Sequence, residues 1–505
     1  MLARINTITF NGLETLPVDL QVQISSGMPN FTIVGLPDKA IGESKERVRS
    51  AIQSLGLSLP AKRITINLSP ADLLKEGSHF DLPVALGILC CMGTLPLDEL
   101  SGYIAIGELG LDGSIVSVNG VLPVAMHAYR CDKGLICPFH QGGEAAWSGL
   151  KDIIAAPDLI SLINHFKGEC RLSQPSPLSP RAPQKHLDMS DVKGQESAKR
   201  ALEIAAAGAH NLLMVGPPGS GKSMLAARMP SILPPMTAEE ALETSMIHSV
   251  AGILKEGGLC IERPFRSPHH NASTPSLVGG GRRAKPGEIS LAHNGVLFLD
   301  EFPEFDRSAL EALRQPLENA QISIARVNTH AVYPAKFQLI AAMNPCRCGN
   351  LGIPELACPR APKCALEYQS KISGPLLDRI DIHIEVPAVS PWQLSEERTG
   401  ETSEAIRNRV IAARKIQKER FIKHGITNLS TNAELKGQLL EELTLLENDA
   451  KNLLVTFADK NHLSARAYHR TLRLARTIAD LQNNPNILKM HIAEALSYRH
   501  TVPES

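Results

Sequence analysis

The chain has 505 residues, of which 43% are hydrophobic and 21% are charged. This length excludes a single ordinary hydrophobic core, so we expect a globular protein of two to four domains. The 52 basic and 52 acidic side chains cancel. Overall charge therefore indicates neither a nucleic acid nor a membrane as a partner, and only local charge can do so.

The sequence shows no targeting signal that we can identify. The first residues, MLARINTITF, lack the basic segment and apolar core of a signal peptide. The longest apolar run starts at Leu82 and has about 16 residues, interrupted by glycines, whereas a membrane span needs about 20. We predict a buried helix there. Ten cysteines without a secretion signal indicate a reducing environment, so we expect a cytoplasmic protein.

Changes in composition divide the chain into four parts. Residues 1–170 mix the alternating segments LPVDLQVQIS and KRITINLS, typical of strands, with the helical pattern ESKERVRSAIQSLG. Residues 171–187 hold four prolines and predict a linker. Residues 188–389 alternate apolar strands with helices, as in a parallel sheet. Residues 390–505 predict helices near 402–424, 432–456, 463–480 and 485–498. The fold class is therefore multidomain α/β, with an N-terminal α+β domain and a C-terminal helical domain.

The stretch NLLMVGPPGSGKSMLAARMP (211–230) predicts a site for a nucleoside triphosphate. A short apolar strand precedes the spacing G-x-x-x-x-G-K-[ST], and a helix follows it. The glycines let the backbone curl so that its N–H groups and the helix N-terminus face the phosphates. We expect Lys222 to reach the β- and γ-phosphates and Ser223 to bind Mg²⁺. The predicted nucleotide-binding residues are Gly216, Pro217, Pro218, Gly219, Ser220, Gly221, Lys222 and Ser223.

A second apolar strand, GVLFLDEF (295–302), carries two acids at its C-terminal end. Ligands bind at that edge of a parallel sheet. We expect Asp300 to hold the Mg²⁺ through water and Glu301 to be the general base that polarises the attacking water. The alternative is that the two acids only cap a helix. The preceding apolar strand and the separation from Lys222 disfavour that alternative.

Three more polar residues extend this predicted site. Asn344 ends the apolar strand FQLIAAMNP and can orient the same water. Arg379 lies at a helix-to-strand corner in GPLLDRIDIH, and Arg466 lies early in a helix in HLSARAYHRTLRLAR. Taken alone, each arginine could equally be a surface charge.

Together these motifs resemble the AAA+ ATPases, and most fully the branch around the magnesium-chelatase I subunit and the MCM helicases. The resemblance implies that Asn344 is sensor 1, that Arg379 is an arginine finger acting on the neighbour's ATP, and that Arg466 is sensor 2. A finger delivered to a neighbour implies a ring, here a homo-hexamer. The segment DVKGQESAKRALEIAAAGAHN (191–211) matches the helix before the nucleotide loop, with Val192 and Gly194 beside the adenine.

The first domain resembles the proteolytic domain of Lon proteases, in INLSPADLLKEGSHFDLPVALGIL and GELGLDGSIVSVNGVLPVAMHA. That domain uses a Ser–Lys dyad, in which an amine activates a hydroxyl. The match places His79 at the nucleophile position and Leu122 at the lysine position. Ser78 is one residue away and has no amine in the partner position. We therefore expect a catalytically inactive domain that serves as a scaffold or a docking module.

This order of domains is similar to that of the ComM/YifB family over essentially all 505 residues. Members of that family are known as hexameric helicases that drive branch migration of recombining DNA during natural transformation. The resemblance thus implies ATP and Mg²⁺ as cofactors. It also implies a DNA partner, single-stranded or branched, bound without sequence preference.

Local basic segments support a DNA partner in part. The segment RPFRSPHHNASTPSLVGGGRRAKPGEIS (263–290) has five Arg/Lys and no acid between the first and the last of them, which suits phosphate contacts in a central pore. A solvated loop is the alternative. The stretch AQISIARVNTHAVYPAKFQ (320–338) predicts two strands around a turn and resembles a DNA-contacting hairpin of MCM helicases. A third basic run, from Arg407 to Lys423, is more typical of a solvated helix face. The predicted DNA contacts are Arg282, Arg283, Lys285 and Arg326.

Four cysteines follow Asn344 within NPCRCGNLGIPELACPRAPKC: Cys346, Cys348, Cys358 and Cys364. Four thiolates could form a tetrahedral zinc site. The first pair is closer in sequence than is usual for zinc, and the second pair is wider. Free thiols beside the nucleotide site are the alternative.

Three functions fit these observations. The first is a DNA motor, the second a chelatase-like or protein-remodelling ATPase, and the third an ATP-dependent protease. His79 and Leu122 disfavour the protease. The basic segment 263–290 and Arg326 favour the DNA motor over the chelatase-like ATPase.

Overall fold

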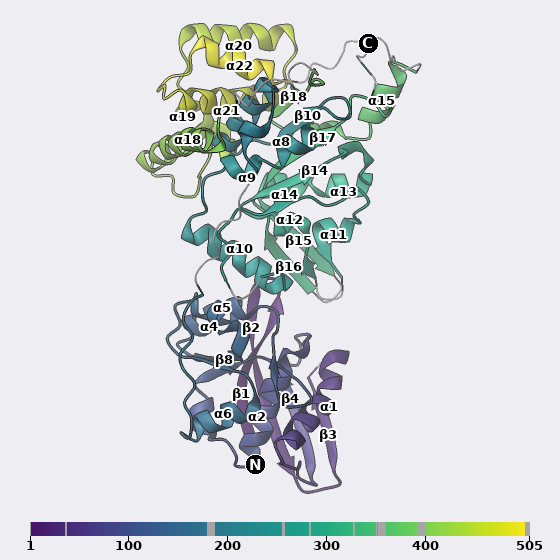
Figure 1. Cartoon of the computed structure of the whole chain (residues 1–505), viewed down its shortest axis with the longest axis vertical. Helices are drawn as coiled ribbons and strands as arrows, with labels where there is room; N and C mark the ends of the chain where they lie inside the picture. The colour runs from purple at the N-terminus through teal and green to yellow at the C-terminus, as the bar shows by residue number, and fades with distance from the viewer. Residues whose placement is uncertain are drawn as a thin grey trace.

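The computed structural model describes residues 2–35, 38–178, 187–254, 258–281, 284–326, 329–349, 351, 360–390 and 400–499. A sheet from the N-terminal part lies at one end of the elongated molecule, a second sheet lies in the middle, and the C-terminal helices lie at the other end (Figure 1).

The N-terminal part forms a seven-stranded sheet in the order β3-β4-β2-β1-β5-β8-β9. Strand β2 pairs antiparallel with β1 and β4, and the other neighbours pair parallel. The strands are β1 (Leu2–Asn11), β2 (Glu14–Ser25), β3 (Asn30–Val34), β4 (Arg63–Ser69), β5 (Tyr103–Ala105), β8 (Gly134–Pro138) and β9 (Ile153–Ala156), with a separate small pair of β6 (Glu108–Leu109) and β7 (Ile115–Val116). The two alternating segments of the sequence are β2 and β4, as predicted.

Helices pack on this sheet through their buried apolar side chains. They are α1 (Lys39–Ser54), α2 (Asp81–Cys91), α3 (Leu97–Leu100), α4 (Val121–Arg130), α5 (Gly142–Ala146) and α6 (Leu159–Phe166). Helix α2 is buried from Asp81 to Cys90, which confirms the buried helix predicted from Leu82. Gly87 lets α2 approach the sheet closely, since a Cβ there would lie 2.5 Å from Val22.

The middle of the chain forms a five-stranded parallel sheet in the order β11-β14-β17-β10-β18. Its strands are β11 (Phe265–Arg266), β14 (Val296–Leu299), β17 (Gln338–Met343), β10 (Leu212–Val215) and β18 (Ile382–Glu385). Alternate residues enter two separate cores: Leu212 and Met214 pack with the helical side, and Leu213 packs with the other. Both faces are therefore covered, as expected for a parallel sheet.

Short helices and two hairpins surround this sheet. The helices are α7 (Glu196–Gly208), α8 (Lys222–Ala226), α9 (Met229–Ile232), α10 (Ala238–Ala251), α11 (Thr274–Val278), α12 (Glu288–Leu291), α13 (Arg307–Ala312), α14 (Arg314–Asn319), α15 (Lys363–Gln369) and α16 (Gly374–Leu377). One hairpin pairs β12 (Gly279–Gly280) with β13 (Lys285–Pro286), and the other pairs β15 (Gln321–Arg326) with β16 (Thr329–Pro334). The second hairpin confirms the two strands predicted within 320–338.

The C-terminal part consists of α18 (Ser403–Lys423), α19 (Gly437–Leu443), α20 (Asn448–Lys460), α21 (Ala465–Leu481) and α22 (Lys489–Ser497). The single helix expected over 432–456 is wrong, because the chain breaks between α19 and α20. At the break, the backbone N–H of Glu447 donates to Ile487 O and the N–H of Ile487 donates to Leu445 O. Pairing with the segment before α22 thus replaces helical hydrogen bonds there.

The N-terminal part joins the middle of the molecule where α4 and α5 meet α10 (Figure 1). The N–H of Gly120, at the start of α4, donates to Ser249 O of α10 at 3.1 Å. The Ser249 hydroxyl also donates to the buried carboxylate of Glu144. Gly12, in the β1–β2 turn, packs against Ala331 and Tyr333 of β16. Among the described residues, none of the helices combines the length and apolarity that crossing a bilayer requires.

Candidate functional site

The glycine-rich loop lies at the carboxyl edge of the parallel sheet. It leaves β10 at Gly216 and enters α8 at Lys222. Gly219 and Gly221 have φ values of +78° and +90°, the left-handed region that favours glycine. Gly216 is needed for a different reason, because a Cβ there would lie 2.1 Å from the carbonyl oxygen of Val386. The sequence thus folds this segment into a tight loop that faces the helix N-terminus.

Lys222 occupies the interior of the loop. Its ammonium group donates to the carbonyl oxygens of Gly216 and Pro217, both at 2.8 Å, and to Asn344 Oδ1 at 3.3 Å. Burial lowers the pKa of Lys222, and the nearby charge of Asp300 opposes that shift. The predicted sensor residue Asn344 and the loop lysine are therefore in direct contact, as expected if both face one phosphate group.

Ser223 and Asp300 form the second half of the site. The Ser223 hydroxyl donates to Asp300 Oδ2 at 2.5 Å. These residues come from α8 and from the end of β14, with β17 between their strands in the sheet. Mg²⁺ prefers oxygen ligands, and in nucleotide sites it is bound by one or two protein oxygens together with the phosphates. Here a hydroxyl and a carboxylate lie beside the loop whose backbone N–H groups would bind those phosphates. The residues present therefore fit Mg²⁺–ATP, with Ser223 and Asp300 on the metal side.

Glu301 follows Asp300 in a strained backbone conformation. Its φ is +51° although it is not glycine, and its N–H donates to Asp300 Oδ1 at 2.9 Å. Its carboxylate contacts the imidazole of His270, with 2.8 Å between Nδ1 and Oε2. Sequence reasoning missed His270. The only available signal was its place in the polar run SPHHNAS between the two motifs.

Arg379 and Arg466 lie at the opposite edge of the sheet from their own nucleotide loop. They line a cavity of about 820 Å³ together with Asn211, Gly295 and Gln338, which stand at the amino ends of β10, β14 and β17. The Arg379 guanidinium contacts Glu318 and the Pro375 carbonyl oxygen. Other basic residues of the cavity are Arg263, Lys336, Arg414, Lys436, Arg470 and Arg473. The structure thus groups the two predicted arginines but separates them from the loop of the same subunit.

Of the predicted DNA contacts, Arg282 and Arg283 lie outside the described residues, and Arg326 is described only in its backbone, at the end of β15. Lys285 is exposed on β13. Two basic residues of the same segment are engaged internally. Arg263 pairs with Glu240 at 2.8 Å and Arg266 pairs with Glu288 at 2.6 Å.

Three of the seven basic residues in the run on α18 make contacts with other parts of the molecule. Arg409 pairs with Glu203 and Glu401, and Arg420 pairs with Asp480. Arg414 donates to the Ala206 carbonyl oxygen, and burial lowers the pKa of Arg414 to about 9. These contacts bind α18 to the rest of the molecule, whereas Lys415, Lys418 and Lys423 are exposed.

Three of the four clustered cysteines come together. The sulfur atoms of Cys346, Cys348 and Cys364 all lie within 4.8 Å of one another, and those of Cys346 and Cys348 are 3.2 Å apart. Sulfurs around a tetrahedral zinc stand about 3.8 Å apart, given a Zn–S distance of about 2.3 Å. The described thiols therefore fit three zinc ligands, while Cys358 lies outside the described residues.

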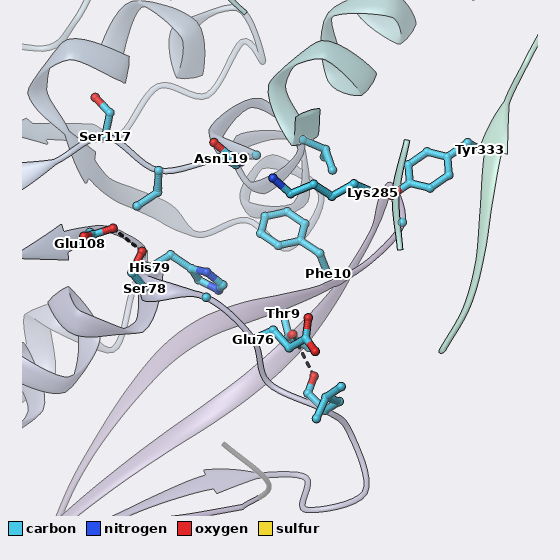
Figure 2. Close-up of a pocket in the computed structure, with 16 residues that line it drawn as sticks. Thr9, Phe10, Glu76, Ser78, His79, Glu108, Ser117, Asn119, Lys285 and Tyr333 are labelled. Atoms are coloured by element: carbon cyan, nitrogen blue, oxygen red, sulfur yellow. Dashed lines mark hydrogen bonds between the residues drawn. The ribbon is translucent and has the colours of Figure 1, made fainter. Parts of the chain in front are cut away.

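His79, which the match places at the nucleophile position, and its neighbour Ser78 line a cavity of about 220 Å³ between the N-terminal sheet and the middle of the molecule (Figure 2). The Ser78 hydroxyl donates to Glu108, and His79 Nε2 contacts the Ile8 carbonyl oxygen at 2.9 Å. Leu122 is fully buried in α4. An amine does reach this cavity, but it belongs to Lys285 of β13 (Figure 2).

Comparisons with known proteins agree along the chain. Residues 188–394 match the family model "Magnesium chelatase, subunit ChlI", residues 20–141 match "Subunit ChlI of Mg-chelatase", and residues 400–499 match the ChlI C-terminal model. Competence protein ComM of Haemophilus influenzae is 43% identical over 97% of this chain and 96% of its own length. The uncharacterized protein YifB of Salmonella typhimurium is 42% identical over 99% of this chain and 97% of its own length. The magnesium-chelatase 67 kDa subunit of Chlorobaculum parvum is 27% identical over 32% of this chain and 23% of its own length.

The full-length matches exceed the chelatase match in both identity and coverage. The parallel sheet, the glycine-rich loop and the helical C-terminal part are those expected of a ChlI-like AAA+ protein, a family that implies ATP and Mg²⁺. The chain therefore belongs to the ComM/YifB family of magnesium-chelatase ChlI-like AAA+ proteins.

Proposed function

We propose that this protein is an ATP-driven DNA motor: a hexameric ring in the cytoplasm that hydrolyses ATP and promotes branch migration of recombining DNA. Lys222, Ser223 and Asp300 bind Mg²⁺–ATP, Glu301 activates the attacking water, and Asn344 orients that water. The observation that carries the proposal is the contact network of Lys222, Asn344, Ser223 and Asp300 at one edge of the sheet.

The opposite edge of the sheet supports a ring. Arg379 and Arg466 face a basic cavity at the amino ends of the strands, whereas the nucleotide loop lies at the carboxyl ends. In a head-to-tail arrangement, the amino ends of the strands of one subunit face the carboxyl ends, and so the nucleotide loop, of the next subunit. A cluster of guanidinium groups placed there would neutralise the charge that develops on the neighbour's γ-phosphate.

Two hairpins support DNA as the moved substrate. Lys285 lies on the β12–β13 hairpin and Arg326 ends β15 of the second hairpin. The Tyr333 hydroxyl of β16 donates to the Ala284 carbonyl oxygen at 2.9 Å, so the two hairpins are joined. Contacts of such cations with phosphates would be tolerant of sequence and sensitive to salt. The name of the ComM relative, a competence protein, agrees with a role in DNA uptake and recombination.

A chelatase-like or protein-remodelling ATPase is the second candidate. The matches to the ChlI family models favour it, as does the partial similarity to a magnesium-chelatase subunit. The full-length similarity to a competence protein favours the DNA motor instead.

The decisive experiment is a branch-migration assay on a synthetic four-way junction with ATP and Mg²⁺, run beside ATP hydrolysis with and without forked DNA. We expect DNA to stimulate hydrolysis and the junction to be resolved into its product duplexes. Lys222→Ala should abolish nucleotide binding, and Glu301→Gln should bind ATP without hydrolysing it. Hydrolysis that ignores every DNA offered would reject the DNA motor and favour the second candidate.

A further inference from the structure

Arg379 is held within its own subunit, although the proposed ring needs its guanidinium at the ATP of the neighbour. The guanidinium pairs with the Glu318 carboxylate and donates to the Pro375 carbonyl oxygen. The side chain of Arg379 is only 11% exposed, whereas that of Glu318 is 46% exposed, and both residues line the basic cavity at the amino ends of the strands. An anion of the same subunit therefore occupies the charge that the neighbour's phosphates would bind.

The backbone that carries Arg379 is fixed, so its side chain is the part that can respond to a ligand. Asn211 Nδ2 donates to the Arg379 carbonyl oxygen at 2.9 Å, and Arg470 Nη1 donates to the Ile380 carbonyl oxygen at 2.6 Å. Within the described part of the chain, Glu318 is the one acid that pairs with this guanidinium. It is thus the charged contact that sets the direction of the guanidinium.

A carboxylate and a phosphate compete for such a guanidinium. Each accepts hydrogen bonds from its planar fork of N–H groups, often two at once. Two anions that lie side by side repel each other, so a phosphate that reaches Arg379 would not share it with Glu318. Because the backbone of Arg379 is held, the γ-phosphate of the neighbour would take the guanidinium and release the Glu318 carboxylate.

Glu318 lies where the second hairpin and the C-terminal part of the chain meet. It is in the last turn of α14, and a single residue, Ala320, separates α14 from β15. The N–H of Ala335, just after β16, donates to the Ala320 carbonyl oxygen at 2.8 Å and ties the base of the hairpin to this helix end. Lys436 Nζ donates to the Glu318 carbonyl oxygen at 3.0 Å. Release of the Glu318 side chain would therefore loosen the helix end on which the hairpin stands.

We propose that Glu318 is a positioning residue that holds Arg379 until the γ-phosphate of the neighbour's ATP displaces it, and that this exchange moves the β15–β16 hairpin. The inference rests on the proposed function, in which Arg379 acts on the neighbour's ATP and the hairpin contacts DNA. It adds the link between these two events. ATP bound by one subunit thereby shifts a DNA-contacting hairpin of the next.

The test measures kcat and KM for ATP, together with the ATP consumed per four-way junction resolved, in the full-length protein. Glu318→Gln keeps the size of the side chain and removes its charge. A neutral amide competes weakly for the guanidinium, so we expect KM to fall by about tenfold, the effect of removing one hydrogen bond between charged groups, with kcat unchanged. The ATP consumed per junction should rise severalfold, because ATP no longer breaks an ion pair at the base of the hairpin. Glu318→Asp, which keeps the charge, should stay close to the wild type.

Glu311→Gln is the matched control. Glu311 lies on α13, pairs with Arg314 of α14 at 2.9 Å and does not line the cavity. This variant should keep the KM and the ATP consumption of the wild type. In an Arg379→Ala background, Glu318→Gln should leave the Kd for ATP unchanged, because Glu318 acts only through Arg379.

A KM that stays the same or rises in Glu318→Gln would overturn the inference, since the carboxylate would then support the arginine and not compete with ATP. A lower KM with unchanged ATP consumption per junction would also overturn it, because the exchange would not reach the hairpin. A wild type that hydrolyses ATP but resolves no junction would reject the proposed DNA motor. The KM values would still decide whether Glu318 holds Arg379 back from the neighbour's phosphates.

Discussion

Asp381 is a buried carboxylate whose charge contributes to the stability of the fold beside β18. It precedes β18, its side chain is 8% exposed, and it contacts His210 at 3.1 Å and Arg473 at 3.5 Å. Burial alone would raise its pKa, but Arg473 and His210 outweigh burial and hold the pKa of Asp381 at about 2. Because an unfolded aspartate has a pKa of about 3.9, this carboxylate stabilises the fold fully above about pH 4. The contribution is lost as the pH falls through about 2.

We therefore expect Asp381→Asn to lower the free energy of unfolding by about 2 kcal/mol at pH 7. The difference from the wild type should narrow as the pH falls from 5 toward 3, in denaturant titrations at a series of pH values. Asp378→Asn is the control, because Asp378 is 45% exposed and its pair with Arg470 should contribute little. A deficit for Asp381→Asn that is independent of pH would contradict this account.

At the scale of residues, spacing predicted the nucleotide loop, and the ends of apolar strands predicted Asp300 and Asn344. The structure brings these side chains into contact with the loop, and their roles stay predictions. A motif of fixed spacing carries its geometry with it, since the loop and the strand ends determine where the side chains lie. His270 could not be predicted, because its contact with Glu301 depends on the path of an irregular segment after β11. The arrival of Lys285 in the cavity beside Ser78 depends on how two domains dock, which no local pattern encodes.

At the scale of elements, periodicity located most strands and helices but failed between α19 and α20. Residues 432–456 have continuous helical patterning, yet the backbone around Leu446 forms a bridge with Ile487. A partner far along the chain supplies these hydrogen bonds, so a window of local sequence cannot reveal the break. The β15–β16 hairpin was predictable because its partner strand follows at once.

The cysteine segment after β17 gives a prediction at this scale. We expect protein purified without chelator to contain about one zinc per chain by elemental analysis, because three thiols already lie at ligand distances. Cys348→Ser and Cys364→Ser should each lose most of the metal. Cys131→Ser is the control, since Cys131 is exposed on another part of the molecule. Fewer than roughly 0.2 zinc per wild-type chain would leave free thiols as the correct interpretation.

At the scale of the whole molecule, the division into domains stays a prediction from composition, and the structure adds that the proposed catalytic residues lie at opposite ends of the strands. The family resemblance implied that Arg379 acts on a neighbour's ATP, and the structure places Arg379 and Arg466 at the amino ends of the strands, away from the loop that holds Lys222. In the proposed ring, each subunit would carry one half of a hydrolysis site at each end of its strands. Its activity should therefore depend on assembly.

Mixed rings test this dependence. We expect Lys222→Ala and Arg379→Ala to be inactive alone but partly active when co-expressed with different tags and purified through both. A subunit with an intact loop then meets a neighbour with an intact arginine at about a quarter of the interfaces, if heterologous contacts form at random. The rate of ATP hydrolysis should recover to about a quarter of the wild-type rate, and Arg466→Ala should complement Lys222→Ala in the same way.

The control is a mixture of Lys222→Ala with Glu301→Gln. It should recover no activity, because both changes damage the half of the site at the carboxyl ends of the strands. If the two mixtures that contain an arginine variant were as inactive as this control, each subunit would complete its own site. The proposed ring would then have no role in hydrolysis.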